Sequence, residues 1–215
     1  VLGIYLLSLL SKPMAVTFPM VLLAIDYYKD RKIDVKNLVE KTPFFLLSLA
    51  FGVVALKTQG GSAMDIVPDF SFVDRFAIVC YGVVFYIIKL FVPTGMASIH
   101  YYPDNSVALP WEFYSAPFII IAIGLLIWRA KSFRKELIFG LAFFLFSISI
   151  VLQIVPVGHA FASERYSYVP YIGLVFIIGQ LYAWCWENNK GKWLMAGLLG
   201  VAAFTFSKIT YDELP

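Results

Sequence analysis

Long apolar segments separated by short polar stretches constrain this chain more than any other feature of its sequence. A helix needs about 20 predominantly apolar residues to cross the hydrocarbon core of a bilayer. The chain is 60% hydrophobic and only 14% charged, whereas about a quarter of the residues in a soluble domain are charged. Only helices and closed barrels satisfy every backbone group in lipid, and the alternating short strands of a barrel are not seen. We therefore predict an all-α fold, a polytopic transmembrane helical bundle.

The segments form about seven or eight membrane elements, and we expect one of them to be re-entrant. We assign residues 1–215 to a single transmembrane domain. Because Val1 lies inside an apolar run without an initiating Met or a charged leader, we expect the chain to be part of a longer protein. The apolar segments are 1–11, 14–28, 43–58, 76–92, 115–129, 137–154, 167–186 and 193–208.

Basic loops predict the orientation of these segments, because short cytoplasmic loops carry an excess of Lys and Arg. Loops 129–136 and 187–192 are basic, so both should be cytoplasmic, and the loops around 93–113 and 155–166 should be exoplasmic. Loop 29–41 is also basic, but three full crossings between it and loop 129–136 would put the two on opposite sides. One of these elements must therefore not be a full crossing of the membrane. The candidates are segment 43–58, which is short, and the first pair of segments.

Charge and cysteine content exclude several classes of function. The net charge of +3 is spread over loops and gives no clustered basic footprint for nucleic acid. Cys80 and Cys185 lie within apolar segments, where they fit as small buried hydrophobes. The two histidines are far apart and have no Cys or carboxylate at ligand spacing, so no metal site is predicted and a requirement for a divalent metal stays open.

Residues 163–174, SERYSYVPYIGL, place charge directly before an apolar segment. The guanidinium of Arg165 is always charged, its planar fork suits phosphate, and it should lie at headgroup depth. Glu164 could orient Arg165 or contact a substrate. In the alternative interpretation, Arg165 pairs with Glu164 or extends to water.

Lys12 lies at a second interruption, between LLSLLS and PMAVTFPMVLLAI. Pro13 and Pro19 cannot donate backbone hydrogen bonds, so the sequence predicts a broken or kinked helix there. An ammonium at such a break is a candidate anion ligand, whereas a lysine that extends to water at a helix end is the alternative. Lys89, before Pro93, has the same two interpretations.

The two predicted exoplasmic loops hold further polar candidates. His100, Tyr101, Tyr102 and Asp104 lie in the first, and His159 lies in the second. Tyr102 and the other polar groups of the first loop could meet a sugar or peptide, and His159 is a further candidate for substrate binding. For the histidines, ordinary loop hydrogen bonding is the favoured alternative.

Asp65, Asp69 and Asp74 are spaced as carboxylates that could bind a divalent cation. With Arg75 adjacent, we interpret them as a solvated linker.

Three stretches together carry a resemblance: LLSLLSKPMAVTFPMVLLAIDYY, LFVPTGMASIHYYP and SERYSYVPYIGL. In this order the chain resembles the GT-C class of multispanning glycosyltransferases, specifically protein O-mannosyltransferase-like proteins with tetratricopeptide repeats after the membrane region. The third stretch is the most specific, since relatives typically have an acidic residue, Arg-Tyr, one residue, then Tyr-hydrophobic-Pro. The matching residues here are Glu164, Arg165, Tyr166, Tyr168 and Pro170.

The resemblance implies transfer of a mannose-like hexose from a polyprenyl-phosphate carrier to an exoplasmic acceptor, a protein Ser/Thr hydroxyl or a glycan. Arg165 would hold the lipid phosphate and stabilise its developing charge, with Glu164, Tyr166 and Lys12 beside it. The implied mechanism is inverting. Its acidic base normally lies in an exoplasmic loop upstream of this chain, so no residue here is assigned a catalytic role. The upstream catalytic loop and the downstream repeats are both expected outside the chain, which would be the C-terminal part of a GT-C membrane module and inactive alone.

The polyprenyl-phosphate-linked sugar is the expected donor, no other cofactor is implied, and the bacterial inner membrane is preferred to the endoplasmic reticulum. A transporter or lipid flippase remains the main alternative, because transporters also combine broken helices with intramembrane charge. Transporters often show internal repeats, and none is evident in this sequence.

Overall fold

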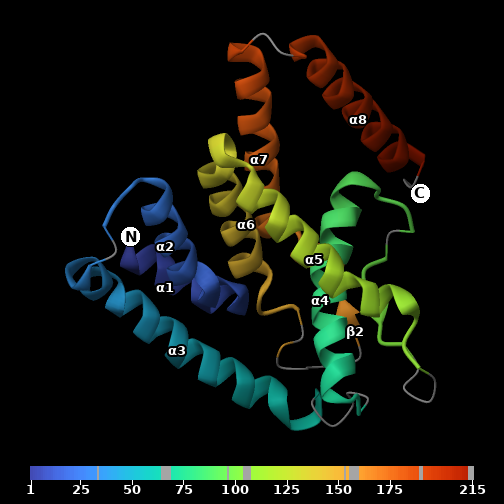
Figure 1. Cartoon of the computed structure of the whole chain (residues 1–215). Coiled ribbons are helices and arrows are strands. Elements are labelled where there is room, and N and C mark those ends of the chain that lie inside the picture. Colours follow the sequence, from blue (N-terminus) through green and yellow to red (C-terminus); the bar gives the residue numbers. More distant parts are fainter. Residues whose placement is uncertain are drawn as a thin grey trace.

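The chain is all-helical, as predicted, apart from one short sheet. The computed structural model describes residues 1–32, 34–63, 69–95, 97–103, 108–152, 154, 160–188 and 191–212, with side chains except at 59–63 and 212. In these residues the chain forms α1 (Leu2–Ser11), η1 (Pro13–Thr17), α2 (Phe18–Tyr28), α3 (Val35–Ala63), α4 (Phe72–Phe91), β1 (His100–Tyr101), α5 (Trp111–Arg129), η2 (Lys131–Phe133), α6 (Arg134–Ile148), β2 (Ala160–Ala162), η3 (Glu164–Tyr166), α7 (Tyr168–Glu187) and α8 (Lys192–Asp212) (Figure 1). The η elements are 3₁₀ helices, and β1 pairs antiparallel with β2.

Each predicted apolar segment overlaps one α-helix, but fewer helices than expected qualify as membrane spans. Among the described residues, four helices are long and apolar enough to cross a membrane: Val35–Thr58, Trp111–Arg129, Tyr168–Glu187 and Lys192–Tyr211. Helices α1 and α2 have 10 and 11 residues. At 1.5 Å per residue each is about half as long as the roughly 30 Å hydrocarbon core is thick. The prediction of seven or eight spans is therefore not confirmed.

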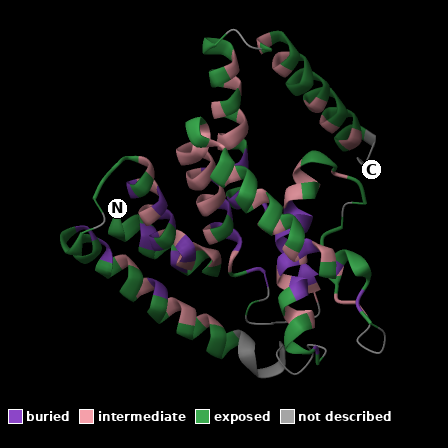
Figure 2. Cartoon of the chain, in the orientation of Figure 1, coloured by how far each residue is buried: buried purple, intermediate pink, exposed green. Residues whose placement is uncertain are grey.

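The candidate spans present apolar side chains outward. Figure 2 shows α8 exposed or half-buried along its described length, and buried residues gathered on the middle of α4. On α8 the exposed side chains include Trp193, Val201 and Phe204. Soluble proteins rarely expose contiguous apolar faces of this extent, whereas lipid covers such faces without cost. The burial pattern is compatible with helices surrounded by a membrane.

Helix α3 begins earlier than the apolar pattern indicated. The predicted segment starts at residue 43, but the helix starts at Val35, where the Asp34 side chain accepts a hydrogen bond from the backbone N–H of Asn37 at 2.8 Å. Such caps satisfy backbone donors at a helix N-terminus. In the first turns of α3, Lys41 is buried against Asp26 of α2 in an ion pair. A search for apolar residues misses these polar turns, so segment 43–58 is part of a helix of full spanning length.

Helices α6 and α7 pack antiparallel at a glycine contact (Figure 1). A Cβ atom built on Gly140 would lie 2.6 Å from the carbonyl oxygen of Gly173, and one built on Gly173 would lie 2.9 Å from the backbone nitrogen of Phe144. Only glycine at both positions permits this approach, as in other closely packed membrane helices. The contact fixes α7, and with it the turn that precedes α7.

Helices α4 and α5 lie together at their N-terminal ends. The hydroxyl of Tyr114 donates a hydrogen bond to Asp74 at 2.6 Å, which joins the first turn of α5 to the first turn of α4. Two consecutive helices in contact at their N-terminal ends cannot form a tight antiparallel hairpin. The described residues between the two helices, 92–95, 97–103 and 108–110, therefore run back along α4 before α5 begins (Figure 1).

The two basic loops lie together in the fold. Lys135 at the start of α6 forms an ion pair with Asp30 and lies 5.6 Å from the ring centroid of Tyr28, so the two basic loops are at the same end of the bundle. From the sequence, the element that is not a full crossing was expected to be segment 43–58 or to lie in the first pair of segments. Segment 43–58 belongs to a long helix, and α4, which lies between that helix and α5 in the sequence, is not among the four candidate spans of the described residues.

Candidate functional site

The turn that carries Arg165 is held by buried hydrogen bonds. The Tyr86 hydroxyl of α4 donates to the carbonyl oxygen of Ser163 and accepts from its backbone N–H, both at 2.9 Å. The Ser163 hydroxyl donates to the carbonyl oxygen of Ser98 at 2.6 Å, and the Ser167 hydroxyl to that of Glu164 at 2.7 Å. Tyr86 is fully buried. These bonds tie η3 to α4 and to the loop around β1.

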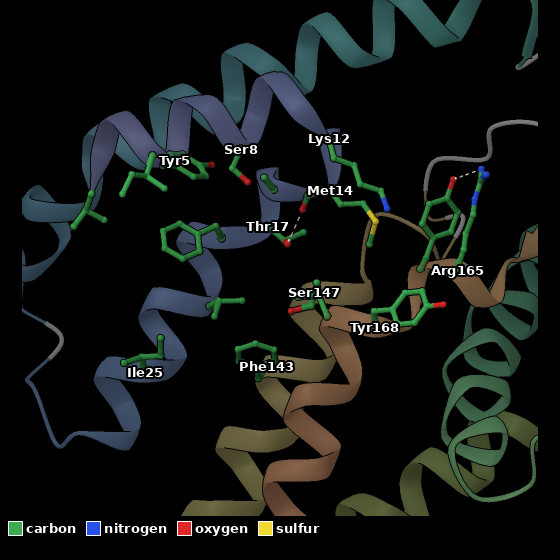
Figure 3. A pocket seen from close by; sticks show the side chains of 17 residues that line it. Tyr5, Ser8, Lys12, Met14, Thr17, Ile25, Phe143, Ser147, Arg165 and Tyr168 are labelled. Carbon is green, nitrogen blue, oxygen red and sulfur yellow. Dashed lines mark hydrogen bonds between the residues drawn. The ribbon is translucent and has the colours of Figure 1, made fainter. Parts of the chain in front are cut away.

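The predicted break at Lys12 is confirmed. Helix α1 ends at Ser11, and Lys12 has extended backbone angles (φ −151°, ψ 126°) before the 3₁₀ helix η1. The missing donor at Pro13 explains why the α-helix does not continue. Figure 3 shows the side chain of Lys12 extending from this break toward Arg165 and the turn that carries it.

Two cations lie against one tyrosine ring. The Lys12 Nζ atom is 5.3 Å and the Arg165 Cζ atom 4.9 Å from the centroid of the Tyr166 ring. A guanidinium nitrogen of Arg165 also donates a hydrogen bond to the Tyr166 hydroxyl at 2.8 Å. Cation–π attraction at such distances contributes about 0.5–2 kcal/mol. The ring thus brings together two positive charges from opposite ends of the sequence.

These residues line the mouth of a cavity of about 600 Å³, within the usual range of roughly 300–1,000 Å³ for small-molecule sites. Its walls come from α1, η1, α2, α6, η3 and the start of α7, and beyond Lys12 and Arg165 they are mainly apolar (Figure 3). The lining residues are Val1, Ile4, Tyr5, Ser8, Lys12, Met14, Ala15, Thr17, Phe18, Val21, Ile25, Phe143, Ser147, Arg165, Tyr166, Tyr168 and Val169.

The mouth of the cavity is positively charged. Within the described part of the chain, no carboxylate lies within 4.0 Å of the Lys12 ammonium or the Arg165 guanidinium. The lining residues include no aspartate or glutamate. Two neighbouring cations without a counter-ion repel each other and attract an anion. The site therefore combines an anion-binding mouth with an apolar interior.

Glu164 faces away from this cavity. Its carboxylate lies 3.0 Å from His100 Nε2 and 3.5 Å from Lys89 Nζ, and it accepts a 3.3 Å hydrogen bond from the backbone N–H of Ala97. The adjacent residues Glu164 and Arg165 thus lie on different sides of η3. Through these contacts Glu164 connects η3 to the loop around β1. It is not among the residues that line the cavity.

Tyr102 also lies apart from the cavity. Its ring packs 5.7 Å from that of Phe70 against the main core, and burial raises the pKa of Tyr102 to about 12. Its hydroxyl therefore stays protonated at neutral pH. His159, Asp104 and Asp65 fall outside the described residues.

The remaining acidic residues of the predicted linker do not converge. Asp69 is 4.0 Å from Arg75, and Asp74 accepts hydrogen bonds from Ser71 and Tyr114. In the described portion, no group of three His, Cys, Asp or Glu side chains is placed to hold a metal ion.

The structure thus joins Lys12, Arg165 and Tyr166 from the predicted set. It also reveals two residues that the sequence did not indicate. In the sequence, Tyr86 is one of several aromatic residues in an apolar segment. Ser147 is a single polar residue within another apolar segment. Neither position carries a local signal, because each acquires its role from chain segments distant in sequence.

Comparison with known proteins gave no relative: no family model matches the chain, and no curated protein or solved structure matches it either.

Proposed function

We propose that the chain belongs to a membrane glycosyltransferase that moves a hexose from a polyprenyl-phosphate carrier to an exoplasmic acceptor. The acceptor is a protein Ser/Thr hydroxyl or a glycan. The observation that carries the proposal is that Lys12 and Arg165 both lie against the ring of Tyr166, at the mouth of an apolar cavity. The type of reaction is inferred from the sequence resemblance to the GT-C class.

A polyprenyl phosphate has a charged end and a long apolar chain, which match the charged mouth and the apolar wall of the cavity. Its phosphate would meet the two cations, and its isoprenoid chain would lie along the apolar wall. The Arg165 fork can hold two phosphate oxygens at once, whereas Lys12 adds a point charge. Charge that develops on the departing lipid phosphate during sugar transfer would be stabilised by the same two groups. The proposal assigns no catalytic base to this chain.

The proposal includes a membrane topology. Loops 29–34, 129–136 and 187–192 would be cytoplasmic because they are basic. The turn at 164–166 would then be exoplasmic, at the depth of lipid headgroups. Seven or eight membrane elements would include the short helices α1 and α2, folded against longer helices, as happens where irregular backbone lines a protein cavity. A bacterial inner membrane is the proposed location.

The test is transfer activity of the intact protein with Arg165→Ala. We expect a loss of about 10²–10³-fold in kcat, because preorganised groups that stabilise developing charge contribute on that scale. Arg165→Lys should retain part of the activity, since it keeps the charge but loses the fork. Arg129→Ala is the matched control, because Arg129 is exposed at the end of α5 and does not line the cavity. Wild-type activity of a folded Arg165→Ala protein would refute the phosphate role.

The same preparation separates a transferase from a lipid flippase. A flippase would move the lipid-linked sugar across a vesicle membrane without attaching the sugar to any acceptor. If the intact protein in vesicles translocates the lipid and never forms a glycosylated acceptor, the transferase proposal fails and the transporter alternative replaces it.

A further inference from the structure

Ser147 is a buried hydroxyl on the cavity wall without a hydrogen-bond partner. It lies at the end of α6, and only 3% of the residue surface is exposed. Among the residues that the structure describes, nothing accepts from or donates to its Oγ atom. Buried polar groups in proteins are nearly always paired, and each exception requires an explanation.

The usual explanation for a helical serine does not apply here. Serine hydroxyls inside helices ordinarily donate to a carbonyl oxygen about one turn back. The neighbouring Ser149 does this, donating to the carbonyl oxygen of Phe146 at 2.9 Å. Ser147 does not. Leaving a buried hydroxyl unpaired costs about 1–3 kcal/mol, so alanine would be the more stable residue at this position if nothing bound there.

The position of Ser147 indicates what its partner would be. Figure 3 shows its hydroxyl group pointing into the cavity from α6, in the space that α1, η1 and α2 border on the other side. The two other hydroxyls on the wall that belong to buried residues are already used within the protein: Tyr5 bonds to Ser48, and Thr17 donates to the carbonyl oxygen of Met14. Ser147 therefore offers a free donor inside a cavity whose mouth carries two cations.

We propose that Ser147 donates a hydrogen bond to the phosphate-ester end of the lipid ligand. This inference rests on the proposed function and extends it: the phosphate enters the cavity instead of resting on its outer edge. Lys12 at the α1–η1 break, Arg165 on η3 and Ser147 on α6 all line this cavity. The hydroxyl distinguishes a prenyl phosphate from the corresponding prenyl alcohol, because only the phosphate provides a charged acceptor at this depth.

Binding of farnesyl phosphate and of farnesol to the intact protein in detergent tests this inference. A hydrogen bond to a charged group contributes enough that Ser147→Ala should weaken farnesyl phosphate binding about tenfold or more. Farnesol binding should stay within about twofold of wild type. Ser149→Ala is the matched control, because that hydroxyl is on the same helix end and is bonded to backbone. It should change neither affinity.

Two substitutions of nearly equal shape separate the contribution of the hydroxyl to binding from that of side-chain size. Ser147→Thr and Ser147→Val add side chains of nearly the same form, and only the threonine keeps a hydroxyl. The threonine variant should bind farnesyl phosphate about tenfold more tightly than the valine variant. Equal affinities of this pair, or equal weakening of farnesol and farnesyl phosphate by Ser147→Ala, would overturn the role of Ser147.

Failure of the inference can be distinguished from failure of the proposed function. If Lys12→Ala and Arg165→Ala weaken farnesyl phosphate binding and Ser147→Ala does not, the phosphate rests at the mouth and only the inference about Ser147 is wrong. If wild-type protein prefers farnesol to farnesyl phosphate, or binds neither, both the inference and the phosphate site fail.

Discussion

Tyr86 sets the position of Arg165 although it never touches it. Its hydroxyl is bonded to both backbone groups of Ser163, two residues before Arg165. Tyr86→Phe would leave the ring in place and remove both bonds, exposing a buried N–H and a buried C=O without partners. Such losses cost about 1–3 kcal/mol each. We expect a lower midpoint of thermal unfolding in detergent, and a larger proportional loss of farnesyl phosphate binding than of farnesol binding.

Tyr182→Phe provides the control for this substitution. Tyr182 lies half-buried on α7, where its ring packs 5.8 Å from that of Trp186, and the described residues offer its hydroxyl no hydrogen bond. It should unfold like wild type. If Tyr86→Phe is equally neutral, the two bonds do not hold the turn.

At the scale of single residues, sequence reasoning selected Lys12, Arg165 and Tyr166, and these three meet at one cavity. Charge beside an apolar segment was a sufficient signal, because an ionised group at that depth requires a partner. The direction of Glu164 could not be predicted. Adjacent residues in a short 3₁₀ turn point to different sides, and the choice depends on Lys89 and His100, which are distant in sequence.

Among the helices, the α6–α7 contact supports the cavity most directly. Gly173→Ala should separate the two helices, since its Cβ would overlap the backbone of α6. Backbone atoms cannot move aside as flexible side-chain ends can, so we expect a destabilisation of about 1–3 kcal/mol, the usual cost of overpacking. The readout is thermal unfolding of the purified protein in detergent.

Gly179→Ala is the matched control on the same helix. A Cβ atom there meets nothing within 4 Å. In a helix interior alanine is intrinsically favoured over glycine by about 1 kcal/mol in water, so this variant should be as stable as wild type or more stable. Equal unfolding temperatures of the Gly173 and Gly179 variants would show that the close approach is not required.

Helix existence could be predicted from the sequence, but helix ends and packing could not. Each α-helix of the described residues overlaps a run of apolar residues in the sequence. The first turns of α3 were missed because Lys41 and Asn37 are polar in sequence and buried against α2 in the fold. The small size of Gly140 and Gly173 likewise becomes informative only when the two positions face each other.

For the whole molecule, the position of the two basic loops at one end depends on a feature without a hydrophobic signal. A chain segment that returns along α4 is polar and irregular, and counting apolar segments treats it as an ordinary loop. The side-by-side N-terminal ends of α4 and α5 show the return directly. Charge bias therefore placed both basic loops correctly relative to each other, whereas a count of apolar segments alone would place them at opposite ends.

This arrangement, together with the proposed topology, predicts the sidedness of specific residues. In a chain with Cys80 and Cys185 replaced by alanine, Asp30→Cys and Lys135→Cys should react with maleimide only after the membrane is permeabilised from outside. Ser98→Cys, which is exposed beside the turn of Glu164, should react with an impermeant maleimide in intact cells. The double variant Asp30→Cys/Lys135→Cys should also form a disulfide on mild oxidation, because the two side chains are in contact. Labelling of positions 30 and 135 on opposite faces would refute the fold at this scale, since no arrangement of the remaining helices could then keep α2 and α6 in register.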